Sequence, residues 1–592
     1  MYTHPLPRSL ILIFATAFAF TAVAASCVQD ARLFVQLDFE TLTDETLPSR
    51  LADVRAAGAD GVQIALVEFY DEDEVRAQKL ARLANALAFF KNAGLPTAVW
   101  TTTLGYGENF GAAKRRFANS QKLLSVTGRT AARCPTDRNV LAANCDNMRD
   151  FARAGATFIL LDDDFIQTCR PGLGCVCREH LCRLTRKLQR HVTSNDVARA
   201  FSGAPNAVRT AYLDVLGETL ADYARALRRA VDEVNPDVGI GLCASYTHYD
   251  VEGCDLASIL RVLAGRTHRP LLRASGATYW PVKSPRVRGA HLGAVIEFVR
   301  WQAARWRGSD VRLLDENDPH PRADAVVPAT LCELYDACMI AEGDIVRNKY
   351  ILRDYKGAID PAYLKAHLSH APQHAAIAEA FADAAPCGFK VIHPEHQLRA
   401  ATLPKEVGLW AVMKQFSHPM AGLFAAVGNG VATHYDRAAE TPCVAFGAAA
   451  AYLTAADRRR GVLLDKEGAR LLSARGIDIG PESGGPLRLY ANAAGEKYAV
   501  LAHAAWDFDF THPDALHAPL ADIWRFFTNT PPPVEIINTP NVYPLAKRKP
   551  NGDLVVLLCN MGKAPTGDFT VRLDGNERQV SLPSYGFAIL TR

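Results

Sequence analysis

The sequence lacks several features that would assign it to common classes of protein. It has no marked excess of charge, because 66 Lys and Arg residues face 63 Asp and Glu residues and the formal net charge is +3. This balance gives no reason to expect nucleic acid or an anionic membrane as a partner. After the N-terminal residues, no segment approaches the roughly 20 apolar residues that a membrane-spanning helix needs. The composition, with 49% hydrophobic and 22% charged residues, is that of a globular protein.

Two absent motifs narrow the possible enzyme classes. No glycine-rich phosphate loop follows the first apolar strand, at residues 33–37, so a nucleotide-binding doubly wound sheet has little support. Cys443 has no Gly-x-Cys-x-Gly elbow around it, and we interpret it as a packed core thiol. The length of 592 residues leaves room for roughly three or four domains.

The N-terminus has the pattern of a secretory signal peptide. Arg8 precedes an apolar run at residues 10–20, and small residues follow at Ala22-Val23-Ala24. We therefore expect residues 1–24 to be a signal peptide and the protein to be secreted or periplasmic. Ala24-Ala25-Ser26-Cys27 leaves an outer-membrane lipoprotein as an alternative, although Ala24 is a weaker residue than Leu in a lipid-attachment box. A buried apolar N-terminus is the remaining alternative.

From about residue 31 the chain alternates short apolar strands with amphipathic helices, which is typical of βα units and a parallel sheet. The predicted strands are residues 33–37, 61–67, 97–101, 158–161, 238–243, 271–279, 311–314 and 345–352. Helices are predicted at residues 74–92, 178–191, 211–235 and 323–341, with Gly or Pro near their ends. Eight such units predict a (β/α)8 TIM barrel over residues 31–375, with an open doubly wound sheet as the alternative fold.

Several predicted strands end in side chains that are suited to binding a sugar. Carboxylates bind hydroxyl groups through directional hydrogen bonds, while aromatic rings cover the apolar face of a pyranose. Each such residue alone is more often a packing residue, but their recurrence at one barrel face favours a carbohydrate site. The candidates are Asp38, Glu40, Glu68, Phe69, Tyr70, Trp100, Tyr246, His248, Tyr249, Tyr279 and Trp280.

Acidic residues follow two of the predicted strands. The apolar run at residues 157–161 leads into Asp162-Asp163-Asp164, and the run at residues 311–314 leads into Asp315-Glu316-Asn317. Hydrolysis of a glycosidic bond needs a proton donor and a second carboxylate that attacks the sugar or activates water. Asp164 and Glu316 are therefore the candidate catalytic pair. The alternatives are a solvated loop acid for Glu316 and a Ca²⁺ site or helix cap for the three aspartates.

Cysteine is concentrated just around the three aspartates. Of the 14 cysteines in the chain, five fall between Cys134 and Cys177, and Cys182 lies just beyond. Cys175 and Cys177 are too close for an easy mutual disulfide, but their spacing suits two ligands of one Zn²⁺. A structural zinc is one interpretation of this cluster. Disulfides, such as one that Cys169 forms within this loop, are the alternative, because an exported protein folds in an oxidising compartment.

These motifs resemble those of family 42 glycoside hydrolases, the β-galactosidases of clan A. Asp162-Asp163-Asp164-Phe165 followed by Gly174-Cys175-Val176-Cys177 is similar to an Asp-Asn-Glu-Tyr stretch that precedes a Cys-x-Cys cluster in that family. The resemblance implies Asp164 as the acid/base and Glu316 as the nucleophile. It places Asp163 where the family has the Asn that holds the substrate 2-hydroxyl.

The resemblance also implies a metal site and a domain order. Cys134 would join Cys175 and Cys177 as ligands of a structural zinc, with His180 or Cys182 as the fourth ligand. Residues 376–485 resemble the glutamine-amidotransferase-like middle domain of the family, which mediates trimer formation and implies a possible homotrimer. Residues 486–592, with predicted strands at 498–502, 554–558 and 569–573, read as a small β-sandwich.

This chain departs from the family pattern at both aspartates. Asp164 is one methylene shorter than Glu, and Asp163 in place of Asn adds a negative charge and removes amide donors. For the pair to act, Asp164 must hold its proton near neutral pH, which nearby acids promote, while Glu316 is ionised. A retaining reaction needs the carboxyls about 5 Å apart, and the shorter Asp leaves an inverting spacing of about 6.5–9.5 Å as the alternative.

The sequence as a whole therefore predicts an exported, β-galactosidase-like glycoside hydrolase that uses two carboxylates and no catalytic cofactor. The alternative is a non-catalytic carbohydrate-binding or envelope protein built on a degenerate glycosidase barrel. Opposed carboxyl groups favour the enzyme, whereas side chains turned into salt bridges favour the binding protein. The sugar and its linkage depend on loop shapes that one sequence does not fix.

Overall fold

A computed structural model provides the three-dimensional description of the chain. It describes residues 31–592 apart from 107–110, 169–172, 284–291, 320–325, 355–357, 404–429, 503, 505–518, 538 and 540. The predicted signal peptide, the lipid-attachment box and Cys169 lie outside the described residues. Among the described helices, none has both the length and the hydropathy needed to cross a membrane.

Eight parallel strands form a closed barrel, which confirms the predicted fold class. Each strand pairs with its neighbours along the chain, and the last pairs with the first. All eight predicted strands are present, several of them shorter than predicted. They are β1 (Leu33–Asp38), β2 (Gly61–Ala65), β3 (Thr97–Thr101), β6 (Phe158–Leu161), β7 (Gly239–Cys243), β8 (Leu271–Arg273), β9 (Arg312–Leu314) and β10 (Ile345–Lys349).

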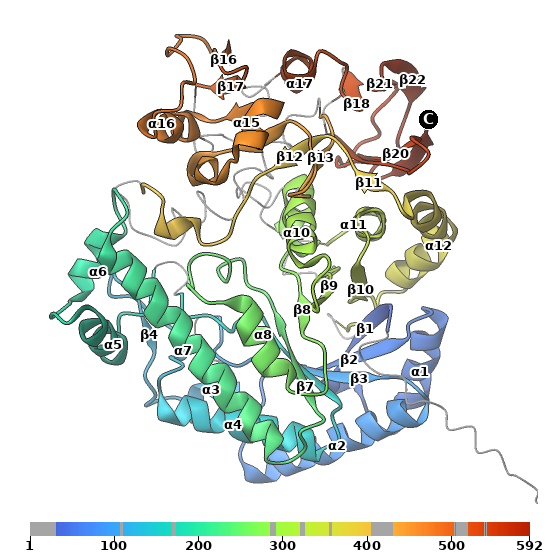
Figure 1. Cartoon of the computed structure of the whole chain (residues 1–592). Coiled ribbons are helices and arrows are strands. Elements are labelled where there is room, and N and C mark those ends of the chain that lie inside the picture. Colours follow the sequence, from blue (N-terminus) through green and yellow to red (C-terminus); the bar gives the residue numbers. More distant parts are fainter. Residues whose placement is uncertain are drawn as a thin grey trace, which may run out of the picture.

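Helices surround the barrel, which forms the lower part of the molecule in Figure 1. The four predicted helices correspond to α2 (Asp73–Asn92), α5 (Arg178–Leu188), α7 (Ala207–Asp232) and α11 (Ala329–Glu342). The others that cover it include α1 (Leu47–Ala56), α4 (Arg138–Arg153), α8 (Leu256–Ala264), α10 (Leu292–Trp306) and α12 (Pro361–Phe381). A short hairpin, β4 (Leu123–Leu124) and β5 (Thr130–Ala131), lies in the connection between β3 and α4.

The pleat of the strands decides which side chains reach the inside of the barrel. Leu160, Leu271 and Leu314 belong to the small cluster of apolar side chains inside it, whereas Leu161 packs outward against the helices. Side chains alternate between the two faces of a strand. The residues two positions further along, Asp162, Arg273 and Glu316, are therefore directed into the carboxyl-terminal mouth of the barrel. Active sites of such barrels lie at this face.

The second part of the chain is a six-stranded sheet. Its order is β13 (Thr433–His434), β12 (Phe389–Val391), β14 (Cys443–Ala445), β15 (Val462–Leu464), β17 (Lys497–Leu501) and β16 (Leu487–Ala491), and only β16 is antiparallel. Among the short helices beside it are α15 (Ala455–Arg460), α16 (Lys466–Ala474) and α17 (Leu520–Thr528). Cys443 is fully buried in the core of this sheet.

One predicted strand belongs to a different sheet from the one expected. Residues 498–502 were assigned to the C-terminal sandwich, but β17 pairs in parallel with β15, with Tyr498 opposite Val462. The middle α/β part therefore continues past residue 485. A short apolar strand carries no information about which neighbour it pairs with, and this explains the error.

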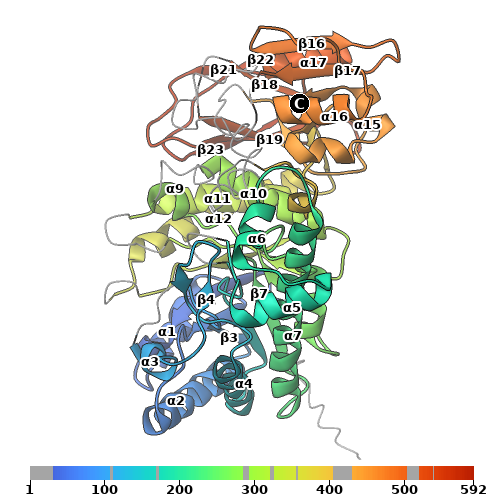
Figure 2. The same cartoon turned by 90° about the vertical axis from the view of Figure 1, so that its left-hand side faces the viewer.

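Two antiparallel sheets complete the chain. One contains β11 (Ala385–Pro386), β19 (Val542–Arg548), β20 (Leu554–Asn560) and β23 (Phe587–Thr591), and the other contains β18 (Val534–Ile537), β21 (Phe569–Leu573) and β22 (Asn576–Val580). Side chains from both sheets share one apolar core, as in a β-sandwich. Figure 2 shows the six-stranded sheet and the sandwich side by side above the barrel.

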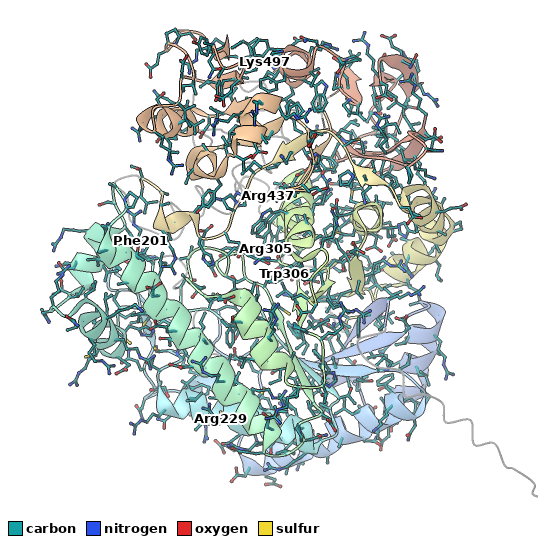
Figure 3. All side chains as sticks on the ribbon, viewed as in Figure 1. Phe201, Arg229, Arg305, Trp306, Arg437 and Lys497 are labelled. Carbon is teal, nitrogen blue, oxygen red and sulfur yellow. The ribbon has the colours of Figure 1, made fainter. Side chains whose placement is uncertain are left out.

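The junction between the barrel and the six-stranded sheet runs along α10. Arg305 and Arg437, labelled in Figure 3, lie on the two sides of this junction and line a cavity of about 230 Å³. At this junction the indole N–H of Trp301 donates a hydrogen bond of 2.8 Å to the carbonyl of His393.

Candidate active site

Two acidic side chains meet at one buried arginine in the mouth of the barrel. Arg273, at the end of β8, is 2% exposed. Its Nη2 lies 3.2 Å from Oδ1 of Asp162 and 3.2 Å from Oε1 of Glu316. The nearest oxygens of the two carboxyl groups are therefore no further apart than twice that distance. Its Nη1 donates a hydrogen bond of 2.6 Å to the hydroxyl of Tyr350, which follows β10.

Further contacts fix the orientation of these acids. The hydroxyl of Tyr106 lies between Asp162 and Asp163, contacting both and lying 2.5 Å from Oδ1 of Asp163. Asp163 is half-buried, whereas Asp162 is 4% exposed. On the opposite side, Oε2 of Glu316 accepts a hydrogen bond of 3.3 Å from the backbone N–H of Gly276. Asp163 is thus the most accessible acid of the group.

Burial separates the ionisation of the two acids at Arg273. Burial, and then the charge of Asp163, raises the pKa of Asp162 to about 6 against the opposing charge of Arg273. Burial raises the pKa of Glu316 to about 8, again against Arg273. Between these values Asp162 is ionised and Glu316 holds a proton. A base and an acid then lie on either side of one guanidinium.

Asp164 lies elsewhere. Its Oδ2 accepts hydrogen bonds from the backbone N–H groups of Thr103, at 2.7 Å, and Gly105, at 2.5 Å, and its side chain is fully buried. Burial, and then the charge of Asp162, raises its pKa to about 7. The structure thus makes Asp162, rather than Asp164, the carboxyl partner of Glu316. The chain leaves the sheet after Leu161, so the third aspartate turns toward the loop that follows β3.

Four of the predicted sugar-binding aromatic residues fall into two places. Trp100 is 7% exposed, and the guanidinium carbon of Arg353 lies 5.8 Å from the centroid of its ring. Tyr246 and Trp280 form an edge-to-face pair with centroids 6.4 Å apart, and Tyr279 beside them is half-buried. These last three residues follow β7 and β8, on the side of the mouth where Arg273 lies.

Two other predicted binding residues serve other contacts. His248 is 1% exposed, its Nδ1 accepts from the backbone N–H of Ser245 at 2.9 Å, and its Nε2 lies 2.8 Å from the carbonyl of Phe165. Burial lowers its pKa to about 4, so it is a neutral ring that braces two loops. Glu68 is half-buried and lies 3.8 Å from the guanidinium of Arg133.

Four residues of the mouth were missed by the sequence analysis: Arg273, Tyr106, Tyr350 and Arg353. Arg353 forms an ion pair of 2.7 Å with Asp38, which had been named as a sugar-binding candidate. A signal existed for Arg273, because it lies two residues after Leu271 in an apolar strand and so at an inward-facing position. No such periodicity applies to the other three, which follow strands.

Three cysteines and one histidine form a second cluster beside this mouth. The ligand atoms of Cys134, Cys175, Cys177 and His180 all lie within 4.8 Å of one another, and all four residues are buried. The Sγ atoms of Cys134 and Cys177 are 3.9 Å apart, and Nδ1 of His180 lies 3.1 Å from Sγ of Cys177. Cys134 follows the β4–β5 hairpin. The N–H of Val176, between the other two cysteines, donates to the carbonyl of Leu124 in this hairpin, which brings Cys134 to the cluster.

The donor set of this cluster fits a structural zinc ion. Three thiols and one imidazole are a common tetrahedral zinc set, and ligating histidines usually bond through their second ring nitrogen. Here Nε2 of His180 lies 2.6 Å from Oε1 of Gln167, and contacts with Cys134 and Cys175 lower the pKa of the Cys177 thiol. His180 therefore takes the fourth position, and Cys182, which is exposed, lies outside the cluster.

Glu333, Asp336 and His374 also lie close enough together to resemble a metal site. Nζ of Lys349 lies 2.8 Å from Glu333 and 2.7 Å from Asp336, and all three side chains are buried. The lysine ammonium supplies the positive charge that these carboxylates need. We interpret this group as a buried ion-pair network of the barrel.

Comparisons with known proteins agree with this architecture. No protein-family profile matches the chain, and no curated protein matches its sequence. Solved structures that resemble it include a cold-adapted β-galactosidase from Rahnella sp. R3, with 13% identity, a TM-score of 0.55 and coverage of 95% of this chain and 98% of that chain. A β-galactosidase from Bacillus circulans sp. alkalophilus shows 12% identity, a TM-score of 0.57 and coverage of 95% and 99%.

A third structure is a catalytic mutant of a GH42 β-galactosidase from G. stearothermophilus. It shares 9% identity with this chain, with a TM-score of 0.58 and coverage of 95% of this chain and 98% of that chain. The likeness extends over nearly the whole of both chains, so it includes the parts beyond the barrel. The chain therefore has the fold of the GH42 β-galactosidases.

Proposed function

We propose that the protein is a glycoside hydrolase whose catalytic carboxyl groups are Asp162 and Glu316. The observation that carries the proposal is their shared contact with Arg273 at the mouth of the barrel. A carboxyl pair that faces one sugar ring is the requirement for glycosidic hydrolysis. The fold shared with β-galactosidases supports a carbohydrate substrate, and β-galactosides are the first substrates to test.

The roles follow from ionisation. Near neutral pH, Glu316 holds the proton that the leaving oxygen must receive, and Asp162 is the ionised carboxylate. This assigns the nucleophile to β6 and the acid to β9, the reverse of the family assignment. We assign a retaining reaction, which needs about 5–5.5 Å between the carboxyl groups, a spacing compatible with their shared contact at Arg273. Asp163, half-buried beside Tyr106, is the group that we propose binds a sugar hydroxyl.

Hydrolysis of aryl α- and β-glycosides and of oligosaccharides by the purified protein tests the proposal. We expect Asp162→Asn to lose activity on every substrate. Glu316→Gln should lose about 10²- to 10⁴-fold on substrates with poor leaving groups and much less on dinitrophenyl glycosides, whose leaving group needs no proton. The matched control is Asp71→Asn. Asp71 also follows a barrel strand, β2, but it forms an ion pair of 2.8 Å with Lys79 and does not belong to the proposed catalytic pair.

Two outcomes would redirect the assignment. If Glu316→Gln fails on all substrates and Asp162→Asn spares the dinitrophenyl glycosides, the roles are those of the family. If the first-formed anomer, followed by NMR, has the inverted configuration, water rather than Asp162 attacks the sugar. Activity that neither substitution reduces would exclude the proposed pair.

A specific observation favours a second function, carbohydrate binding without hydrolysis. Arg273 lies in direct contact with both carboxyl groups, and such a salt bridge neutralises the charge that a nucleophile needs. A folded protein that binds oligosaccharides in calorimetry but releases no sugar would support this function. Trp280→Ala should then weaken the binding, because the indole covers the apolar face of a sugar.

We further propose export, a bound zinc ion and a homotrimer. Residues 1–24 support export, and the N-terminus of the mature protein tests it: cleavage after Ala24 identifies a soluble exported protein, whereas a lipid-modified Cys27 identifies a lipoprotein.

The zinc rests on the buried cluster of three cysteines and His180. The trimer rests on the resemblance of the middle part to the family's oligomerisation domain, and light scattering measures it.

A further inference from the structure

Two buried thiols touch each other at the boundary between the barrel and the C-terminal sandwich. Cys338 lies on α11, a barrel helix, and Cys559 lies on β20, a sandwich strand. Their Sγ atoms are 3.5 Å apart, the two residues are 221 positions apart in sequence, and both side chains are fully buried. Two distant segments therefore meet sulfur to sulfur.

This contact differs from the other cysteines that the structure describes. Sulfur–sulfur contacts within the described residues occur either in the cluster of Cys134, Cys175 and Cys177 or in this pair. The first cluster has a histidine ligand and a metal-like donor set. Among the described residues, no imidazole or carboxylate joins Cys338 and Cys559 in a possible metal-ligand group.

We propose that Cys338 and Cys559 form a disulfide that covalently joins the barrel to the C-terminal sandwich when the chain folds in an oxidising compartment. The proposal rests on the proposed export and is independent of hydrolysis. A disulfide requires the two sulfurs to approach from 3.5 Å to about 2.05 Å. A cross-link between segments so far apart restricts the unfolded chain strongly.

The oxidant is a small-molecule or protein disulfide. The thiolate of one cysteine attacks this disulfide, forms a mixed disulfide and releases one thiolate. The second cysteine then attacks the mixed disulfide and releases the other, so the chain loses two protons and two electrons and the oxidant becomes two thiols. Burial raises the pKa of Cys559 in the folded chain, so the exchange must occur before α11 and β20 pack together.

Peptide mapping tests the cross-link. The chain without residues 1–24 is refolded in glutathione and glutathione disulfide, blocked with a maleimide and digested with trypsin. No Lys or Arg lies between Cys332 and Cys338, so one tryptic peptide carries both. The Cys332→Ala variant is therefore the background for the assignment. We expect a linked pair of peptides in this variant and none after the further change Cys338→Ala.

Stability provides a second readout. We expect the refolded Cys332→Ala protein to have a higher Tm than the same protein after reduction, whereas the variant that also lacks Cys338 should show no such difference. Folded protein in which both Cys338 and Cys559 are fully alkylated after oxidative refolding would overturn the proposal. Free thiols in protein that an exporting host retains inside the cell, beside linked thiols in the refolded sample, would contradict export and leave the cross-link supported.

Discussion

Arg273 contacts two neighbouring acids that differ in protonation because burial raises their pKa values to different levels. With the pKa of Asp162 near 6 and that of Glu316 near 8, the active form has one ionised and one protonated carboxyl. We expect kcat/KM to rise as the pH increases through about 6 and to fall as it passes about 8. These limbs report the titration of the coupled pair, and initial rates between pH 4 and 10 measure them.

Two variants check this interpretation. Glu316→Gln should lose the alkaline limb for dinitrophenyl glycosides, because its side chain does not titrate. Arg273→Gln removes a positive charge that lowers both pKa values, so both limbs should move to higher pH. Limbs that stay in place in this variant would exclude Arg273 as the residue that sets them.

Asp164 is predicted to matter for folding. In Asp164→Ala the N–H groups of buried Thr103 and half-buried Gly105 lose their acceptor, and an unsatisfied buried group costs about 1–3 kcal/mol. We expect the free energy of unfolding to fall by roughly 2–5 kcal/mol, measured by urea denaturation. Asp163→Ala is the matched control, because that side chain is half-buried and, within the described part of the chain, its hydrogen-bond partner is Tyr106. Equal losses in the two variants would contradict this role.

Part of the site could be predicted from single residues. The motif identified the three aspartates and Glu316, but strand alternation, which would have marked Asp162 and Arg273 as inward-facing positions, was not applied. The choice of Asp164 followed the family motif and ignored where the strand ends. Its partners, Thr103 and Gly105, lie in another loop, so only the folded chain reveals them.

At the scale of elements, the β4–β5 hairpin and the first turn of α5 are held together by the proposed zinc site. We expect about one zinc per chain in elemental analysis, and near-complete loss of it in His180→Ala. Cys182→Ala is the matched control on the same helix, because its thiol is exposed and lies outside the cluster. Zinc that persists in His180→Ala, or that disappears in Cys182→Ala, would contradict the ligand assignment.

Removal of the metal should also reach the active site. Arg133, which precedes Cys134, donates its backbone N–H to Leu104, and the loop beyond carries Tyr106. Loss of the zinc therefore loosens the loop that holds Asp162 and Asp163. We expect a chelator to lower both the Tm and kcat, and added zinc to restore them.

The elements differ in how far the sequence determines them. Each barrel strand lies between a helix and a turn in a regular alternation, and this periodicity identified all eight. The strand at residues 498–502 has no such context, and its pairing with β15 depends on contacts that come from elsewhere in the chain. Local pattern predicts that a strand exists better than it predicts its partner.

At the scale of the whole molecule, one buried arginine connects the three parts of the chain. Arg300 on α10 forms ion pairs of 2.9 Å with Glu297 and 2.7 Å with Glu342 inside the barrel layer. It also donates to the carbonyl of Thr433 in β13, at 2.9 Å, and to the hydroxyl of Tyr543 in β19, at 2.6 Å. These contacts fix the six-stranded sheet and the sandwich on the barrel.

Arg300→Met should weaken the contacts between the three parts and lower the stability of the protein. It removes the guanidinium from buried Glu297 and Glu342, although Glu342 keeps an ion pair of 2.7 Å with Arg307, and breaking a buried pair costs about 3–5 kcal/mol. Arg305→Met, on the same helix, is the matched control: the Arg305 side chain is 41% exposed and its pair with Glu395 is worth less than about 1 kcal/mol. The midpoint of urea unfolding at pH 7 measures both losses.

The pH dependence of the Arg300→Met effect identifies its electrostatic origin. In the native protein burial acts to raise the pKa of Glu342, but Arg300 overcomes it and holds that pKa at about 2, so the pair contributes stability above the ordinary pKa of a glutamate and loses it as the pH falls toward 2. Without Arg300 this pKa rises, although Arg307 and Lys547 still lower it, so the variant gains less stability than the native protein as the pH rises. The difference between the two proteins should therefore grow from pH 4 to pH 7, whereas a loss of packing alone would give the same difference at both.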